Sequence, residues 1–102
     1  MIDLLRQYED RIAELCRRFR VARLDVFGSA AVGDFDELRS DLDFLVEFQD
    51  DYPDGPFRQY FDFLAALQSL FGRDVDLVET QAIRNPYFAQ AVNKTRRVLY
   101  AA

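Results

Sequence analysis

The segment 24–48, LDVFGSAAVGDFDELRSDLDFLVEF, determines how the rest of the chain is arranged. It holds two short apolar runs, residues 24–27 and 42–48, which have the length of β-strands and are bounded by turn-forming residues. Side chains alternate along the second run, so one face is apolar and the other begins with Asp41 and Asp43. Their Cα atoms should lie about 6–7 Å apart. Two like charges at the start of an apolar strand favour a cation between them.

A helix is predicted to connect this strand to a second acidic strand downstream. Apolar residues recur at helical spacing over about 57–71, and Gly72 follows as a stop signal. The run DVDLVE at 74–79 then has strand character. A helical crossover between two strands makes them parallel and right-handed, so strands 41–48 and 74–79 should lie side by side.

This parallel pairing predicts where the acidic side chains meet. The amino ends of the two strands lie at the same sheet edge, which brings Asp76 close to Asp41 and Asp43. Asp74 shares a face with Asp76 and is assigned to the strand entry. We therefore expect three carboxylates, those of Asp41, Asp43 and Asp76, to converge at one edge.

The remaining elements complete a small mixed sheet with helices packed on it. The predicted fold therefore belongs to the α/β (α+β) class. We expect an amphipathic helix over 2–19 and a first strand over 22–28, antiparallel to the second strand because it must end where the acids begin. A last helix over 86–94 and a short terminal strand at 98–100 follow. With 102 residues the chain forms a single domain, residues 1–102.

The amino-acid composition excludes several classes of function and of catalytic site. The net charge of −5 argues against a general nucleic-acid-binding surface, because phosphate contacts need Lys and Arg. The absence of histidine and the single cysteine, Cys16, exclude histidine-based catalysis, thiolate zinc sites and internal disulfides. No apolar run is long enough for a membrane span and no secretory signal is present, so we expect a soluble cytoplasmic protein without a membrane partner.

The acidic cluster and the Gly28–Ser29 turn together suggest phosphoryl chemistry. Hard divalent ions such as Mg²⁺ prefer carboxylate oxygens and substrate phosphates, and two ions about 3.5–4 Å apart can clamp the attacking and leaving oxygens. Backbone N–H groups after Gly28 and the Ser29 hydroxyl would bind terminal phosphates. An isolated Asp-x-Asp is most often an ordinary strand-edge feature, but this ordered set of motifs is much rarer.

The set of motifs resembles the minimal nucleotidyltransferases (MNT) of the DNA polymerase beta superfamily, over nearly the whole chain. The matching motifs are VFGS at 26–29, SDLDFLV at 40–46, GRDVDLV at 72–78, NPYF at 85–88 and VLYA at 98–101. The resemblance implies that Asp41 and Asp43 bind two Mg²⁺ ions, that Asp76 completes the acceptor-side metal site and helps activate the acceptor hydroxyl, and that Gly28 and Ser29 bind the triphosphate of ATP.

Two features depart from the family pattern. The segment 30–40, between the Gly-Ser turn and Asp41, is one residue longer than usual. Val32 stands where a basic residue is common, and the loss of a cation beside a triphosphate lowers affinity or rate. A catalytically weak or inactive protein is therefore an open alternative.

The resemblance also implies a biological context. Minimal nucleotidyltransferases commonly act as antitoxins encoded beside a HEPN-type RNase toxin, to which they transfer AMP from ATP. Our first hypothesis is such a Mg²⁺-dependent protein adenylyltransferase. The alternatives are an antitoxin that acts by binding alone, and a nucleotidyltransferase for a small molecule, for which a domain of this size offers little pocket. A homodimer is a further expectation.

Overall fold

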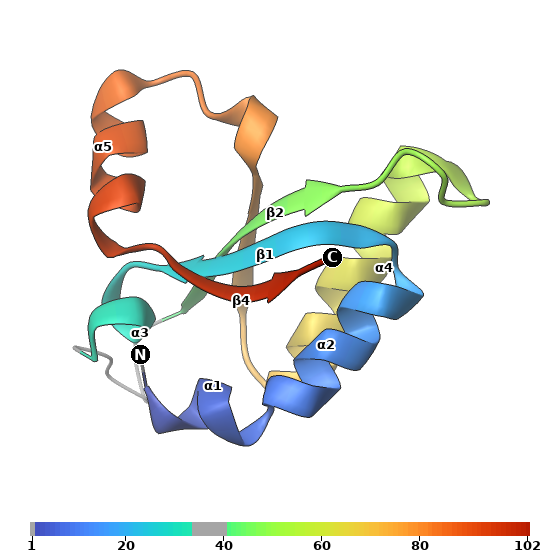
Figure 1. Cartoon of the computed structure of the whole chain (residues 1–102), viewed down its shortest axis with the longest axis horizontal. Helices are drawn as coiled ribbons and strands as arrows, with labels where there is room; N and C mark the ends of the chain where they lie inside the picture. Colours follow the sequence, from blue (N-terminus) through green and yellow to red (C-terminus); the bar gives the residue numbers. More distant parts are fainter. Residues whose placement is uncertain (1, 34–40) are drawn as a thin grey trace.

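The computed structural model describes residues 2–33 and 41–102 (Figure 1). Its centre is a four-stranded sheet in the order β3-β2-β1-β4. The strands are β1 (Val21–Phe27), β2 (Leu42–Phe48), β3 (Val75–Glu79) and β4 (Arg97–Ala101). β1 is antiparallel to both of its neighbours, whereas β2 and β3 are parallel. The predicted mixed sheet, including the parallel crossover pair, is confirmed.

Helices cover both faces of this sheet (Figure 1). On one face lie α1 (Asp3–Gln7), α2 (Glu9–Arg18) and α4 (Gly55–Phe71), the crossover helix that ends at Gly72 in the left-handed conformation. On the other face lies α5 (Pro86–Thr95), which follows the 3₁₀ turn η1 (Thr80–Ala82). A short helix, α3 (Ser29–Val32), follows β1 directly. No helix in the described ranges is both long and apolar enough to cross a bilayer.

The prediction of one continuous helix over 2–19 is wrong, because the helix breaks at Tyr8. This residue closes α1 and precedes α2, and its ring packs edge-on against Phe71 of α4 with centroids 5.5 Å apart. Leu5 and Ile12, on the two separate helices, are both fully buried in the core. The 3₁₀ turn after β3 was not predicted either.

The alternation along β2 separates two cores. Leu42, Phe44 and Val46 point toward α1, α2 and α4 and belong to the main core. The opposite face carries a smaller core of Phe27, Leu45 and Val92, the last from α5. Asp43 is on this second face, because it alternates with Leu42 and Phe44. The acidic edge of the sheet is therefore on the α5 side.

Candidate active site

Asp43 and Asp76 lie directly opposite each other on the parallel strands β2 and β3. The two side chains are close enough for the charge of Asp76 to act on Asp43, and the pKa of Asp43 is raised to about 6. Partial burial of the carboxyl contributes most to this increase, followed by the negative charges of Asp76 and Asp41. Folding thus holds two carboxylates together against their mutual repulsion, an arrangement typical of functional sites.

Gly28 closes the site on the side of β1. The last residue of β1, Phe27, pairs with Asp43 across the antiparallel ladder, so the turn that follows lies beside the Asp43 carboxylate. Gly28 has a φ of +74°, and a Cβ built on it would lie 2.8 Å from Asp43 Oδ2. Any other residue here would meet both backbone strain and a collision with the carboxylate. Glycine is therefore required for the close approach of turn and acid.

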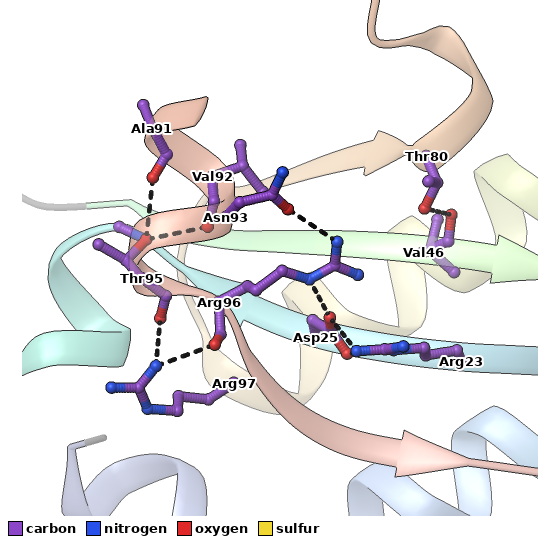
Figure 2. A network of polar contacts seen from close by, with 11 residues as sticks. Arg23, Asp25, Val46, Thr80, Ala91, Val92, Asn93, Thr95, Arg96 and Arg97 are labelled. Atoms are coloured by element: carbon purple, nitrogen blue, oxygen red, sulfur yellow. Dashed lines mark hydrogen bonds and ion pairs between the residues drawn. The ribbon is translucent and has the colours of Figure 1, made fainter. Parts of the chain in front are cut away.

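Thr95, at the end of α5, holds this turn in place. Its Oγ1 accepts a hydrogen bond of 2.9 Å from the Gly28 N–H. The Thr95 hydroxyl in turn lies 3.5 Å from the carbonyl oxygen of Ala91 and 3.4 Å from that of Val92 (Figure 2). The Gly28 N–H is thus committed within the protein, so a triphosphate would be held by the Ser29 hydroxyl and by N–H groups further along the turn. Sequence reasoning missed Thr95, which is 67 residues away from Gly28.

A buried ion cluster fixes the end of α5 and the start of β4 to β1. Asp25 is fully buried and accepts two hydrogen bonds from Arg23, of 2.9 and 3.1 Å. Its Oδ2 also accepts a bond of 2.6 Å from Nε of Arg96, the residue after Thr95 (Figure 2). The Arg96 guanidinium reaches Asn93 as well, at 3.2 Å. An acid in the middle of an apolar strand was the sequence signal for this cluster, which sequence reasoning did not use.

Asp41 is exposed and immediately precedes β2. Its charge contributes to the raised pKa of Asp43. Within residues 2–33 and 41–102, however, no group of three or more acidic, histidine or cysteine side chains is close enough to hold a metal ion. The convergence of Asp41, Asp43 and Asp76 at one metal site therefore stays a prediction. Ser40 lies outside the described residues.

The other predicted positions fall near the pair. Asp76 is exposed on β3, and Asp74 precedes this strand and is also exposed. Ser29 is the first residue of α3 and is half-buried. The N-cap of α3 is Gly28, without a side-chain cap, and Ser29 is the first residue of the helix rather than its cap. Ser29 is nevertheless next to the residue that touches Asp43.

The donor chemistry of the Asp43–Asp76 pair fits a hard divalent cation. Both groups supply only oxygen atoms, and a cation between them would relieve the repulsion that raises the pKa of Asp43. The contact of Asp43 with the Gly28 turn places this pair beside a candidate phosphate-binding segment.

A mixed sheet that presents paired aspartates beside a Gly-Ser turn defines the class of nucleotidyltransferases. Comparison with known proteins agrees. Residues 10–99 match the nucleotidyltransferase domain family, to which the chain therefore belongs. Two relatives from Methanocaldococcus jannaschii, each named as a candidate protein adenylyltransferase, are 30% identical over 93 residues and 35% identical over 92. Each alignment covers 90% of this chain and 87% of the relative.

Solved structures show the same fold. A protein described as a minimal nucleotidyltransferase has a TM-score of 0.76 at 30% identity, with 93% of this chain and 92% of that chain covered. A toxin–antitoxin structure with AMP-PNP has a TM-score of 0.70 at 24% identity, over 92% of this chain and 73% of the other. A complex of a tri-AMPylated Shewanella oneidensis HEPN toxin with its MNT antitoxin has a TM-score of 0.66 at 21% identity, over 96% and 73%.

Proposed function

We propose that this nucleotidyltransferase transfers AMP from ATP to a hydroxyl group of a HEPN-type partner protein, using Mg²⁺, and that it acts as an antitoxin. The observation that carries the proposal is the pairing of Asp43 with Asp76 against the Gly28 turn. Nucleotidyl transfer requires cation-binding oxygens beside a phosphate-binding turn, so this pairing supports the proposal.

In this proposal Asp41 and Asp43 would hold two Mg²⁺ ions, and Asp76 would complete the site of the ion that faces the acceptor hydroxyl. Bound Mg²⁺ supplies charge neutralisation for the triphosphate and lowers the pKa of the acceptor hydroxyl. The turn that begins at Gly28 binds the β- and γ-phosphates, through the Ser29 hydroxyl and the N–H groups that follow Gly28. Asp76 orients the acceptor hydroxyl and takes its proton. The acceptor oxygen forms a bond to the α-phosphorus of ATP, the bond from that phosphorus to pyrophosphate breaks, and pyrophosphate leaves.

The choice of partner rests on the relatives. Curated relatives with identities of 30% and 35% are named as candidate protein adenylyltransferases, which supports a protein acceptor. Neighbours of the same fold occur in complexes with HEPN toxins, one of them AMPylated, which supports a toxin as that acceptor.

One observation favours a second function, inhibition of the toxin by binding alone. Val32 is 54% exposed at the end of α3, close to the Gly-Ser turn, and carries no charge. A basic side chain there would stabilise the triphosphate, so its replacement by valine weakens the case for fast turnover.

Incubation of the purified chain with α-labelled ATP, Mg²⁺ and the product of the neighbouring gene, which the proposal expects to be a HEPN-type protein, distinguishes the two functions. We expect label on the partner with the wild-type chain and its loss in Asp41→Asn/Asp43→Asn. Asp74→Asn is the matched control, since Asp74 is an exposed acid near the site without an assigned role. A tight complex without label under all conditions would leave binding as the function.

A further inference from the structure

A groove runs along the outer edge of the sheet, between β3 and the first half of α4. Its lining residues are Phe57, Tyr60, Phe61, Leu77, Val78, Glu79 and Ala82. Its volume is about 490 Å³, which is within the range of known binding pockets. Because β3 is an edge strand, no other strand of residues 2–33 and 41–102 covers this side.

The groove exposes two large aromatic rings. Phe57 is 72% exposed and Phe61 is 49% exposed, and their ring centroids are 4.8 Å apart on adjacent turns of α4. Exposed rings side by side in a concave apolar surface are typical of a binding site for a partner. The role proposed for Asp76, which is to orient and deprotonate the acceptor hydroxyl, does not explain why these two rings are exposed.

The backbone of β3 offers hydrogen bonds to an added strand. The carbonyl of Asp74 accepts a hydrogen bond from the N–H of Leu42 on β2. Since backbone groups alternate in direction along a parallel strand, those of Asp76 and Val78 also face β2, while those of Leu77 and Glu79 face outward. The hydroxyl of Tyr60 donates to the outward carbonyl of Leu77, which marks this edge as the floor of the groove.

The groove adjoins the candidate active site along β3, because Leu77, which lines the groove, directly follows Asp76. The charges of both Asp76 and Glu79 act on the Tyr60 hydroxyl, whose pKa is raised mainly by burial. The two carboxylates make the rim acidic, so a segment with a Lys or Arg is complementary to it. An extended segment on β3 would therefore pass Asp76.

We propose that this groove binds the acceptor protein as an extended segment, with an apolar side chain against Phe57 and Phe61 and its hydroxyl side chain at Asp76. The proposal rests on the protein-adenylyltransferase function given above, and it identifies the substrate of that site as a strand-like polypeptide with apolar and basic residues near the hydroxyl. Main-chain hydrogen bonds would give affinity, and the aromatic groove would give selectivity.

The test compares Phe57→Ala/Phe61→Ala with the wild-type chain. Both rings are largely exposed, so the fold should persist, and Tyr87→Ala is the matched control because Tyr87 is an aromatic residue of α5 that is 81% exposed. We expect the double variant to have at least a tenfold lower kcat/KM for the HEPN-type partner, with unchanged affinity for ATP. Tyr87→Ala should behave as the wild type.

A second experiment measures partner binding and does not depend on AMP transfer. The same substitutions in an Asp41→Asn/Asp43→Asn background should weaken partner binding by at least tenfold, and partner binding should protect the amide hydrogens of Leu77 and Glu79 from exchange.

If the partner is never labelled but these effects occur, the proposed activity fails and the docking groove stands. Weaker ATP binding alone would assign the groove to the nucleotide. A dimer that dissociates in the double variant would assign it to a second copy. An unchanged partner affinity would also overturn the proposal.

Discussion

At the residue scale, Thr95 is the least expected part of the site. Its Oγ1 accepts the Gly28 N–H at 2.9 Å, and Gly28 touches the Asp43 carboxylate. Thr95 is therefore a positioning residue, which acts on the acid and the turn through Gly28. Sequence reasoning found Gly28 from its motif but had no signal for a partner that lies far along the chain.

Thr95→Val should weaken ATP binding and lower kcat by roughly tenfold, because the loss of one partly buried hydrogen bond costs about 1–2 kcal/mol and frees the turn. Thr95→Ser keeps the hydroxyl and should restore both values. Calorimetric titration with ATP and the rate of AMP transfer provide the two measurements. A variant that is less stable but retains normal ATP affinity and kcat would show that Thr95 has only a structural role.

Asp43 should destabilise the metal-free fold. Its folded pKa, about 6, exceeds the ordinary value of 3.8, so the folded state binds the proton more tightly than the unfolded state does. Stability therefore falls as the pH rises between about 4 and 6, and the full penalty remains at neutral pH.

We predict that Asp43→Asn stabilises the metal-free protein by about 1 kcal/mol at neutral pH, after a discount for solvent screening of the partly exposed carboxyl. Below about pH 3 the variant and the wild type should be equally stable, because the wild-type carboxyl is then largely neutral in both states. Denaturant unfolding in the presence of a chelator across this pH range tests the prediction. A destabilised variant at neutral pH would contradict it.

At the element scale, the Asp25 cluster joins β1 to the segment between α5 and β4. Asp25 is fully buried, and Arg96 supplies its 2.6 Å hydrogen bond from this segment. Thr95 is the last residue of α5 and directly precedes Arg96, so the Asp25 cluster and the Thr95–Gly28 hydrogen bond both require the same position of α5. Sequence patterns predicted that α5 starts at Asn85–Pro86, and the Asn85 side chain does accept the Tyr87 N–H at 2.8 Å. They could not predict where the other end of the helix is fixed.

Arg96→Met should lower the free energy of unfolding by about 2–4 kcal/mol, because it leaves the buried Asp25 carboxylate with Arg23 as its guanidinium partner. Lys94→Met is the control, since Lys94 is exposed on the same helix. Amide exchange should also quicken in α5 and β4. A variant as stable as the control would mean that Arg23 alone satisfies the buried charge.

At the scale of the whole molecule, the sequence predicted the sheet well because apolar alternation on β2 and the helical crossover leave few other topologies. The parallel register that pairs Asp43 with Asp76 is a direct consequence. What local patterns could not provide is the set of long-range contacts. The break at Tyr8 depends on Phe71, and the exposed position of Asp41 is not encoded in its alternation with Asp43.

The most direct test of the central claim compares ATP labelled at the α-phosphate with ATP labelled at the γ-phosphate. With Mg²⁺ and the HEPN-type partner, the account predicts that α-label becomes covalently attached to the partner, that γ-label is released as pyrophosphate, and that Asp43→Asn abolishes the transfer. Transfer of γ-label to the partner, or α-label that persists in Asp43→Asn, would contradict a nucleotidyl-transfer site built on the Asp43–Asp76 pair.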